Sequence, residues 1–457
     1  MTPRDLIFFT LAILIAGSIG YLIADRLCPR NFPRWLVWAF APVTGLGICS
    51  LIVFFFRRPM TTVDAMLLTV LLLFWFRSHR KSSFAEYRDI SSWRAPILAV
   101  VFAMVVGWSV GSLVIRVERY PNGLTDAWAI WNSHAKYLAA GGKTWWLDIQ
   151  NTFHPDYPLL LPGVVVHTWR YIGNNSPDAT GFVGILFELA AVVVLAATLI
   201  KLRSPAIGLL MGHVLIGSPA YVHNAASEYA DVPLSVFVVS TIALICLYES
   251  DESKSPGLIA LAGFMAGCAA WTKNEGVPFA LVTVAVLLAP VFWSPSATVR
   301  RIAGFAAGLA LPLAAIVYFK LKIAPPNDLF ENRTSADVLA KIADPSRYLM
   351  ILKSYGSIGW TFGGWVFNPF LPILAFIGLA GIDRSVLRSF SWRAGVAIIG
   401  LLQVGYFVIY VITPLDLNYH LNSSLDRLLM HVWPGCLLLA GMTVRKEVSP
   451  RTGSSQQ

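Results

Sequence analysis

Charged side chains are what this sequence has least of. Only 13% of its 457 residues are Asp, Glu, Lys or Arg and 56% are apolar, whereas soluble domains carry about 25% charged residues. This balance excludes an ordinary soluble domain and predicts a protein embedded in a membrane.

The apolar residues gather into windows long enough for membrane helices, which need about 20 residues each. About thirteen windows qualify or nearly qualify, and the short alternating segments of a membrane β-barrel are missing. We therefore expect an all-α fold, a polytopic transmembrane bundle of about 13 helices. The windows begin near Leu6, Trp35, Thr61, Ala95, Ala179, Pro205, Val232, Pro256, Val277, Ile302, Phe362, Ala394 and Leu428.

Cysteines are also few, and their spacing shows no pairs. This excludes a disulfide framework and a zinc motif, and predicts small apolar side chains in or beside the apolar windows. The five cysteines are Cys28, Cys49, Cys246, Cys268 and Cys436. A basic leader and a small-residue cleavage site are likewise missing around the first window, so we expect a retained first helix.

The net charge of +10 comes from Lys and Arg in short connectors and not from one soluble face, so nucleic acid is not an expected partner. Basic connectors mark the cytoplasmic side of a membrane protein. They place the amino terminus outside, the carboxyl terminus inside and the polar motifs described below on the outer side.

This topology divides the chain into five parts. It requires that residues 157–173 do not cross the membrane, so we expect that segment and residues 126–138 to be juxtamembrane helices. The parts are three amino-terminal helices in 1–94, a core in 95–323 with an outer loop at 116–177, a second outer loop at 324–361, carboxyl-terminal helices in 362–447 and a disordered tail at 448–457.

The stretch "TDAWAIWNSHAKYL" predicts a helix that opens at Asp126. Ala127, Trp131, Ala135 and Leu138 share one helical face, which we expect to lie on the membrane. Asp126 suits a helix N-cap, because its carboxylate accepts from free backbone amides, and a catalytic carboxylate is equally compatible with this position.

Further along the same loop, "HPDYPLLLPG" combines His154, Asp156 and Tyr157 with three prolines. Proline restricts its own backbone and that of the preceding residue, so His154 and Tyr157 are held in defined directions. A turn with an Asp cap explains the motif as well as a binding role does.

The stretch "NAASEYADVPLSVF" places Glu228 and Asp231 one helical turn apart at the entry to an apolar helix. Two carboxylates at this spacing can face one pocket and hold a divalent cation or a sugar hydroxyl. Asp231 is the stronger candidate, because a charge near hydrocarbon is costly and is retained for a partner.

Two more motifs lie at helix ends on the outer side. "AAWTKNEGV" is a tight turn with Lys273 and Glu275, which predicts a local ion pair or a phosphate contact. "NYHLNSSLDRLLMH" carries His420 and Arg427 into the last helix. Arg427 suits snorkelling at a membrane boundary or bidentate binding of a phosphate.

Taken in order, these motifs resemble the GT-C superfamily of polytopic glycosyltransferases, which includes the protein O-mannosyltransferases and the lipid A aminoarabinose transferases. The resemblance covers residues 95–300, with Arg427 as a further match. Two departures are a single acid in "TDAWA", where the family often has an acidic pair, and "HPDYP", where it commonly has His-Pro-Pro. The resemblance implies a GT-C-like fold and a polyprenyl-phosphate sugar donor.

By this resemblance Asp126 would be the general base of an inverting transfer to an acceptor hydroxyl, because an alcohol needs a carboxylate to accept its proton. Lys273 and Arg427 would stabilise the leaving phosphate. The residues expected to bind substrate are His154, Asp156, Tyr157, Glu228, Asp231, Lys273, Glu275, His420 and Arg427. No cofactor is certain, and a divalent cation stays an open alternative.

The expected partners are a polyprenyl-phosphate-linked sugar, an acceptor glycan, lipid or protein, and membrane lipid. The expected location is an inner (plasma) membrane of bacterial type, crossed many times, with the active site on the extracytoplasmic side. A transporter or flippase of lipid-linked glycans and a non-catalytic scaffold are the alternatives. A transporter should show internal repeats and charged or broken mid-membrane segments, and the sequence gives no sign of these.

Overall fold

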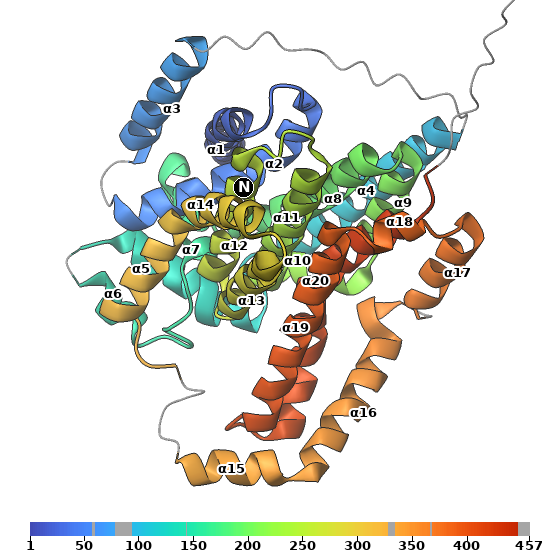
Figure 1. Ribbon diagram of the computed structural model, residues 1–457. Helices are drawn as coiled ribbons and strands as arrows, with labels where there is room; N and C mark the ends of the chain where they lie inside the picture. Colours follow the sequence, from blue (N-terminus) through green and yellow to red (C-terminus); the bar gives the residue numbers. More distant parts are fainter. Residues whose placement is uncertain (57–59, 78–93, 143, 328–333, 366–367, 447–457) are drawn as a thin grey trace, which may run out of the picture.

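The computed structural model describes the chain apart from residues 57–59, 78–93, 143, 328–333, 366–367 and 447–457 (Figure 1). In this described part every regular element is a helix and no strand occurs, although an isolated antiparallel bridge joins Ile382 and Val444. The all-α prediction is therefore confirmed. The predicted tail at 448–457 lies outside the described residues.

The amino-terminal half begins with four long helices. They are α1 (Pro3–Leu27), α2 (Arg34–Phe55), α3 (Met60–Arg77) and α4 (Arg94–Arg119). The segment expected to form the first outer loop then holds the π-helical turn η1 (Ala127–Trp131), α5 (Asn132–Ala140), α6 (Trp145–Ile149) and α7 (Leu160–Ile172). Next come α8 (Pro177–Leu202), α9 (Pro205–Ile216), α10 (Pro219–Ala226) and α11 (Asp231–Ser250).

The carboxyl-terminal half continues with α12 (Pro256–Thr272), α13 (Gly276–Leu288), the 3₁₀ turn η2 (Ala289–Phe292) and α14 (Pro295–Lys322). The second outer loop forms α15 (Ser335–Ala343) and α16 (Pro345–Thr361), followed by the 3₁₀ turn η3 (Phe362–Gly364). The last elements are α17 (Phe370–Ala380), α18 (Arg384–Leu387), α19 (Phe390–Ile412) and α20 (Leu417–Thr443).

Seven helices of the described chain are long and apolar enough to cross a membrane: α1, α2, α4, α8, α11, α14 and α19. The number rises to eight if α9 and α10, which are bent by 62° at the break between them, form one span. A multi-pass membrane protein is therefore indicated. A helix occupies each of the thirteen apolar windows, but the count of thirteen crossings stays a prediction.

Two features of the membrane region were not expected from the sequence. The bent pair α9 and α10 is one, and the carboxyl group of Glu188, fully buried within the apolar helix α8, is the other. The expectation of neither charged nor broken mid-membrane segments is therefore wrong. A proline follows the break at Pro219, which explains why one continuous helix does not form there.

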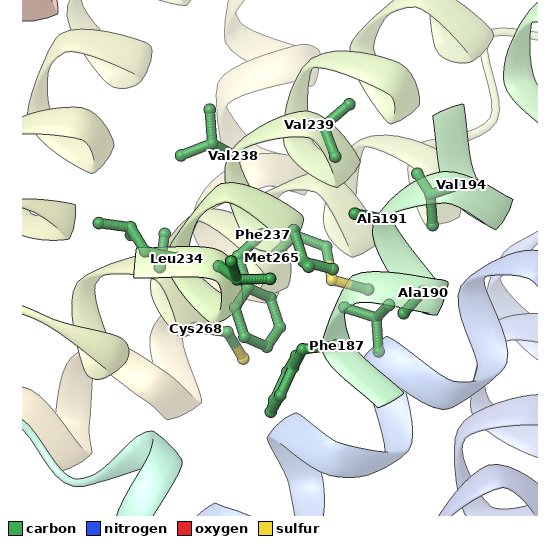
Figure 2. Close-up of a cluster of buried hydrophobic side chains, with 14 of the residues drawn as sticks. Phe187, Ala190, Ala191, Val194, Leu234, Phe237, Val238, Val239, Met265 and Cys268 are labelled. Carbon is green, nitrogen blue, oxygen red and sulfur yellow. The ribbon is translucent and has the colours of Figure 1, made fainter. Parts of the chain in front are cut away.

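The helix α11 lies at the centre of the bundle. Its residues from Asp231 to Tyr248 are all buried, with α8, α12 and α20 packed around them. Figure 2 shows part of this core, in which Phe187 of α8 and Phe237 of α11 meet edge to face with ring centroids 6.1 Å apart. The first residue of α11 is therefore surrounded by protein.

The first outer loop packs on protein and not on the membrane. The face formed by Ala127, Trp131, Ala135 and Leu138 is buried, and α5 contacts α7. The prediction that this face lies on lipid is therefore wrong. The helix α7 has 13 residues and is not among the helices long and apolar enough to cross a membrane, and that it does not cross stays a prediction.

The helices α1 and α2 approach each other through small residues. A Cβ atom on Gly45 would lie 1.9 Å from the carbonyl oxygen of Ala16, and one on Gly20 would lie 1.9 Å from that of Ala41. Such close backbone approach is common between membrane helices, because dispersion contacts replace the hydrophobic effect there. The three helices predicted in 1–94 are present, and α1 and α2 pack directly on α7.

We predict that Gly45→Ala lowers the stability of the folded protein by about 1 to 3 kcal/mol, because the new methyl group forces α1 and α2 apart. The measurement is the thermal unfolding midpoint in detergent. Gly17→Ala is the matched control, since a Cβ there meets no atom within 4 Å. Equal midpoints for the two variants would contradict the close crossing.

Candidate functional site

The carboxylate of Asp231 is the centre of the candidate site. It is fully buried at the start of α11, and three basic side chains surround it. Lys273 Nζ donates to Oδ1 at 2.9 Å, and His431 Nε2 lies 2.7 Å from the same oxygen. Arg427 donates to Oδ2 through Nε at 2.9 Å and through Nη2 at 2.7 Å. Both carboxylate oxygens are therefore fully engaged.

Arg427 carries this interaction outward to Asp126. Its Nη1 lies 2.7 Å from Asp126 Oδ2, and the guanidinium stacks over the ring of Tyr229 at 4.6 Å. One planar side chain thus joins two carboxylates from segments that are far apart in the chain, a geometry that lysine does not reproduce. Asp126 is 29% exposed and Arg427 is 17% exposed, so this end of the cluster faces outward.

Lys273 extends the cluster in the other direction. Its ammonium lies 3.0 Å from Glu275 Oε1, in the turn between α12 and α13. We call the six residues Asp126, Asp231, Lys273, Glu275, Arg427 and His431 the Asp231 network. It contains three carboxylates, two permanent cations and one imidazole.

In this turn, burial and ion pairing shift the pKa values of Lys273 and Glu275 in opposite directions. Burial lowers the pKa of Lys273, but the carboxylates of Asp231 and Glu275 outweigh it and the pKa is raised. Burial likewise raises the pKa of Glu275, but Lys273 and then His431 outweigh it and the pKa is lowered. Both groups are therefore charged at neutral pH, as buried ions require when each has a partner.

His431 orients the network from inside α20. Because the Asp231 carboxylate accepts from cations, we assign the His431 Nε2 atom as the donor. Its Nδ1 atom then accepts from the Tyr406 hydroxyl at 3.2 Å. This residue was missed in the sequence because it lies within an apolar window, although its place one helical turn after Arg427 puts both on one face of α20.

Five residues predicted from the sequence meet in this network: Asp126, Asp231, Lys273, Glu275 and Arg427. Asp126 stands at the N-cap position of η1, as the sequence predicted, but its side chain makes no capping hydrogen bond and pairs with Arg427. Arg427 does not simply snorkel, and the local ion pair of Lys273 with Glu275 is one half of a larger arrangement.

Asp156 is the centre of a second cluster. Its Oδ2 accepts from Asn274 Nδ2 and from Asn327 Nδ2, each at 2.7 Å, and lies 3.4 Å from Lys320 Nζ. Lys320 also donates to the backbone oxygen of Asp156 at 2.6 Å and to Asn274 Oδ1 at 2.8 Å. Asn274 stands between Lys273 and Glu275, so one turn supplies both clusters. Lys320 and Asn327 were missed in the sequence because neither belongs to one of the motifs.

His154 and Tyr157 belong to an aromatic stack beside the site. The two rings lie 4.8 Å apart, and Tyr157 stacks on Trp131 of η1 at 5.5 Å. His154 has a positive φ of 47°, an unusual conformation for a side-chain-bearing residue. The expectation that Pro155 holds His154 in extended geometry is therefore wrong. This stack supports the turn that follows Asp126.

Glu228 does not share a pocket with Asp231, and that prediction is wrong. It lies before α11 with a φ of 61°, so the helical spacing assumed for the two carboxylates does not apply. Its Oε2 accepts from Asn132 Nδ2 at 2.8 Å and from Thr180 Oγ1 at 2.5 Å, while Oε1 has no partner among the described residues. Burial raises the pKa of Glu228 to about 7, although both hydrogen bonds oppose it.

His420 lies in the first turn of α20, where its Nδ1 is 2.8 Å from Thr413 Oγ1 and its ring meets Tyr410 edge to face. It is not a member of the Asp231 network. The neighbouring end of α19 accepts hydrogen bonds from α15 and α16, because Lys341 donates to the Thr413 oxygen and Arg347 to the Val411 oxygen. His420 therefore takes part in docking that loop.

The described residues form one group with the composition and spacing of a metal site, and it includes neither Glu228 nor Asp231, the carboxylates weighed as cation ligands in the sequence. Atoms of Cys49, Asp64 and His167 lie within 4.8 Å of one another, and all three residues are buried. The Tyr171 hydroxyl donates to Asp64 at 2.8 Å. The five cysteines form no disulfide with one another in the described part of the chain. Both oxygens of Asp231 are occupied by cationic side chains, which leaves it no place for a divalent cation.

We predict that Asp231→Asn lowers stability by about 3 to 5 kcal/mol, because Arg427 and Lys273 then stay buried without their shared countercharge. Asp126→Asn should cost less, since Arg427 keeps Asp231. Thermal unfolding in detergent compares both with Asp148→Asn, which changes an exposed carboxyl in the same loop. Equal losses for all three would refute the central place of Asp231.

We predict that Glu228 makes stability fall between about pH 4.5 and pH 7. In that window the unfolded carboxyl has lost its proton while the buried one retains it, so the unfolded state is favoured as pH rises. A pKa rise from 4.5 to about 7 corresponds to about 3 kcal/mol. Glu228→Gln should remove this dependence in pH-resolved thermal unfolding, whereas Glu118→Gln, at an exposed position, should retain it.

Comparisons were made with family models, with curated proteins and with solved structures. None of the three found a match for this chain. The geometry of the site therefore carries the functional proposal by itself.

Proposed function

We propose that the chain is a membrane glycosyltransferase that moves a sugar from a polyprenyl-phosphate donor to an acceptor hydroxyl on a glycan, lipid or protein. The observation that carries this proposal is the carboxylate of Asp126, partly exposed and held by Arg427 against a buried anchor at Asp231. Positioned carboxylates act as general bases when one oxygen is free to accept a proton. No described residue donates to Asp126 Oδ1.

In the proposed reaction the acceptor hydroxyl gives its proton to Asp126 Oδ1 as its oxygen attacks the anomeric carbon. The bond between that carbon and the phosphate oxygen breaks on the opposite face, and its electron pair leaves with the polyprenyl phosphate. Attack from the opposite face inverts the anomeric configuration. The product is a glycoside, and the polyprenyl phosphate stays with its tail in the bilayer.

The leaving phosphate needs a cation to stabilise its negative charge. The two candidates from the sequence, Lys273 and Arg427, differ in how far their side chains are exposed. Each cation is shared between two carboxylates, Lys273 between Asp231 and Glu275 and Arg427 between Asp231 and Asp126, but Arg427 is 17% exposed and Lys273 only 6%. We therefore assign phosphate stabilisation to Arg427 and a supporting role to Lys273. Lys320, 30% exposed beside Asp156, is a second accessible cation at the neighbouring cluster.

The proposal includes the membrane arrangement inferred from the sequence. The site lies on the extracytoplasmic side of an inner membrane of bacterial type, with the amino terminus outside, the carboxyl terminus inside and thirteen crossings in a GT-C-like fold. Asp156, Tyr157 and His154 are placed around the acceptor or donor sugar, and Glu228 supports the Asp126 segment through Asn132. No step needs a divalent cation, and no nucleic acid is involved.

A transporter or flippase of lipid-linked glycans is the second candidate, and one observation favours it. The helices α9 and α10 form a broken membrane segment next to α8, which carries the buried Glu188. Broken helices and buried ionisable groups are typical of transport sites. Glu188 interacts with Ser109 of α4 at 3.4 Å, so this region could couple protonation to movement of α4.

We predict that purified protein releases polyprenyl phosphate from a panel of polyprenyl-phosphate sugars supplied with membrane-extracted acceptors. Asp126→Asn should reduce the rate by about 10² to 10⁴ because the base is lost. Asp148→Asn, on the same loop, should leave the rate unchanged. Equal rates for wild type and Asp126→Asn would refute Asp126 as the base.

A transport assay separates the two candidates. Proteoliposomes report movement of a labelled lipid-linked sugar across the bilayer without release of polyprenyl phosphate. Movement that requires Glu188, tested with Glu188→Gln, together with no turnover for any donor, would replace the transferase proposal. Absence of both activities would favour a scaffold.

A further inference from the structure

An open basic cleft lies at the opposite end of α20 from the Asp231 network. Arg427 and Thr443 are separated by about 24 Å along this helix at 1.5 Å per residue. The cleft follows the end of α20 and has a volume of about 660 Å³. Its lining residues are Gly378, Ile382, Asp383, Arg384, Arg445 and Lys446.

The backbone of the cleft is held in place on both sides. Asp383 N–H donates to the Thr443 oxygen at 2.8 Å, and Arg445 N–H donates to the Gly381 oxygen at 2.9 Å. These bonds form the isolated bridge between Ile382 and Val444. Gly381 has a φ of 84°, a conformation that favours glycine, so the turn before α18 is specified by sequence.

The cations of the cleft lack an internal countercharge. The one acidic residue in the lining, Asp383, accepts from Arg203 at 3.0 Å and from Ser385 Oγ at 2.5 Å. No described carboxylate pairs with Arg384, Arg445 or Lys446. Three exposed cations therefore meet around one concave surface, and guanidinium groups bind phosphate oxygens in a bidentate manner.

Apolar surface continues from the cleft along α17. This helix is apolar throughout, and its side chains Leu371, Leu374 and Leu379 are exposed, Leu379 to 90%. In Figure 1, α17 and α18 lie at the edge of the bundle. A ligand that fits both surfaces has an anionic head for the three cations and a hydrocarbon tail for α17. Basic residues that serve only to orient a protein in the membrane do not need to line a cleft or to lie beside an exposed apolar helix.

We propose that this cleft binds the phosphate head group of an anionic phospholipid, with the acyl chains along α17. Basic pockets between membrane helices on the cytoplasmic side suit such head groups. The lipid is favoured over free phosphate because the exposed leucines of α17 add apolar contact that inorganic phosphate does not use. This site does not depend on the glycosyltransferase proposal.

The test uses the full chain in detergent micelles and counts bound lipid by native mass spectrometry. Phosphatidylglycerol should bind at one molecule per chain, phosphatidylcholine should not, and excess inorganic phosphate should shift phosphatidylglycerol binding less than about twofold. Arg384→Gln, Arg445→Gln and Lys446→Gln together should weaken binding about a hundredfold, at about fivefold for each cation.

The matched control removes three exposed basic residues that do not line the cleft, through Lys201→Gln, Arg300→Gln and Arg388→Gln. It should change binding less than about twofold. The single variant Arg445→Gln gives an independent reading if the triple variant is poorly folded. Equal loss in the control, equal binding of phosphatidylcholine, displacement by inorganic phosphate or unchanged binding in the cleft variants would each overturn the proposal.

Discussion

The buried carboxylate of Asp231 is the constraint on which the rest of the site depends. An ionised carboxylate at the centre of a membrane bundle is stable only when hydrogen-bonding cations compensate for its lost hydration. Lys273, Arg427 and His431 provide this compensation from two other places in the chain, the α12–α13 turn and α20. Folding must therefore bring the start of α11, the end of α12 and α20 together. The same contacts that compensate the charge of Asp231 assemble the site.

Satisfying that charge also positions the groups with catalytic potential. Arg427 cannot serve Asp231 through two donors without presenting its remaining terminal nitrogen, and Asp126 binds there. Lys273 brings with it the turn that contains Asn274, and Asn274 joins the Asp156 cluster. The outer loops are thus fastened to the central helix through two polar clusters that share one turn. In the proposed transferase, the buried anchor at Asp231 would hold the partly exposed Asp126 in place as the general base.

The two ends of the bundle differ in chemistry. The network end pairs its charges internally and presents a carboxylate, whereas the other end leaves three cations around an open cleft beside an apolar helix. Glu188 and the break between α9 and α10, which were not expected, belong to neither the Asp231 network nor the cleft. They add a buried ionisable group and a bend to the membrane region. A transferase would use the Asp231 network, whereas a transporter would use Glu188 and the break between α9 and α10. Because the structure contains both features, an experiment is needed to separate the two functions.

Composition and periodicity alone determined that the chain is all-helical and embedded in a membrane, because apolar windows report directly on burial in lipid or protein. They also singled out Asp126, Asp231, Lys273, Glu275 and Arg427, because a charge at the end of an apolar run is costly wherever the run lies. Only the tertiary structure decided how these charges pair, that Glu228 stands apart, that His431 and Lys320 belong to the clusters, and that the first outer loop packs on protein. Those outcomes depend on contacts between residues from about forty to three hundred positions apart, which local spacing does not encode.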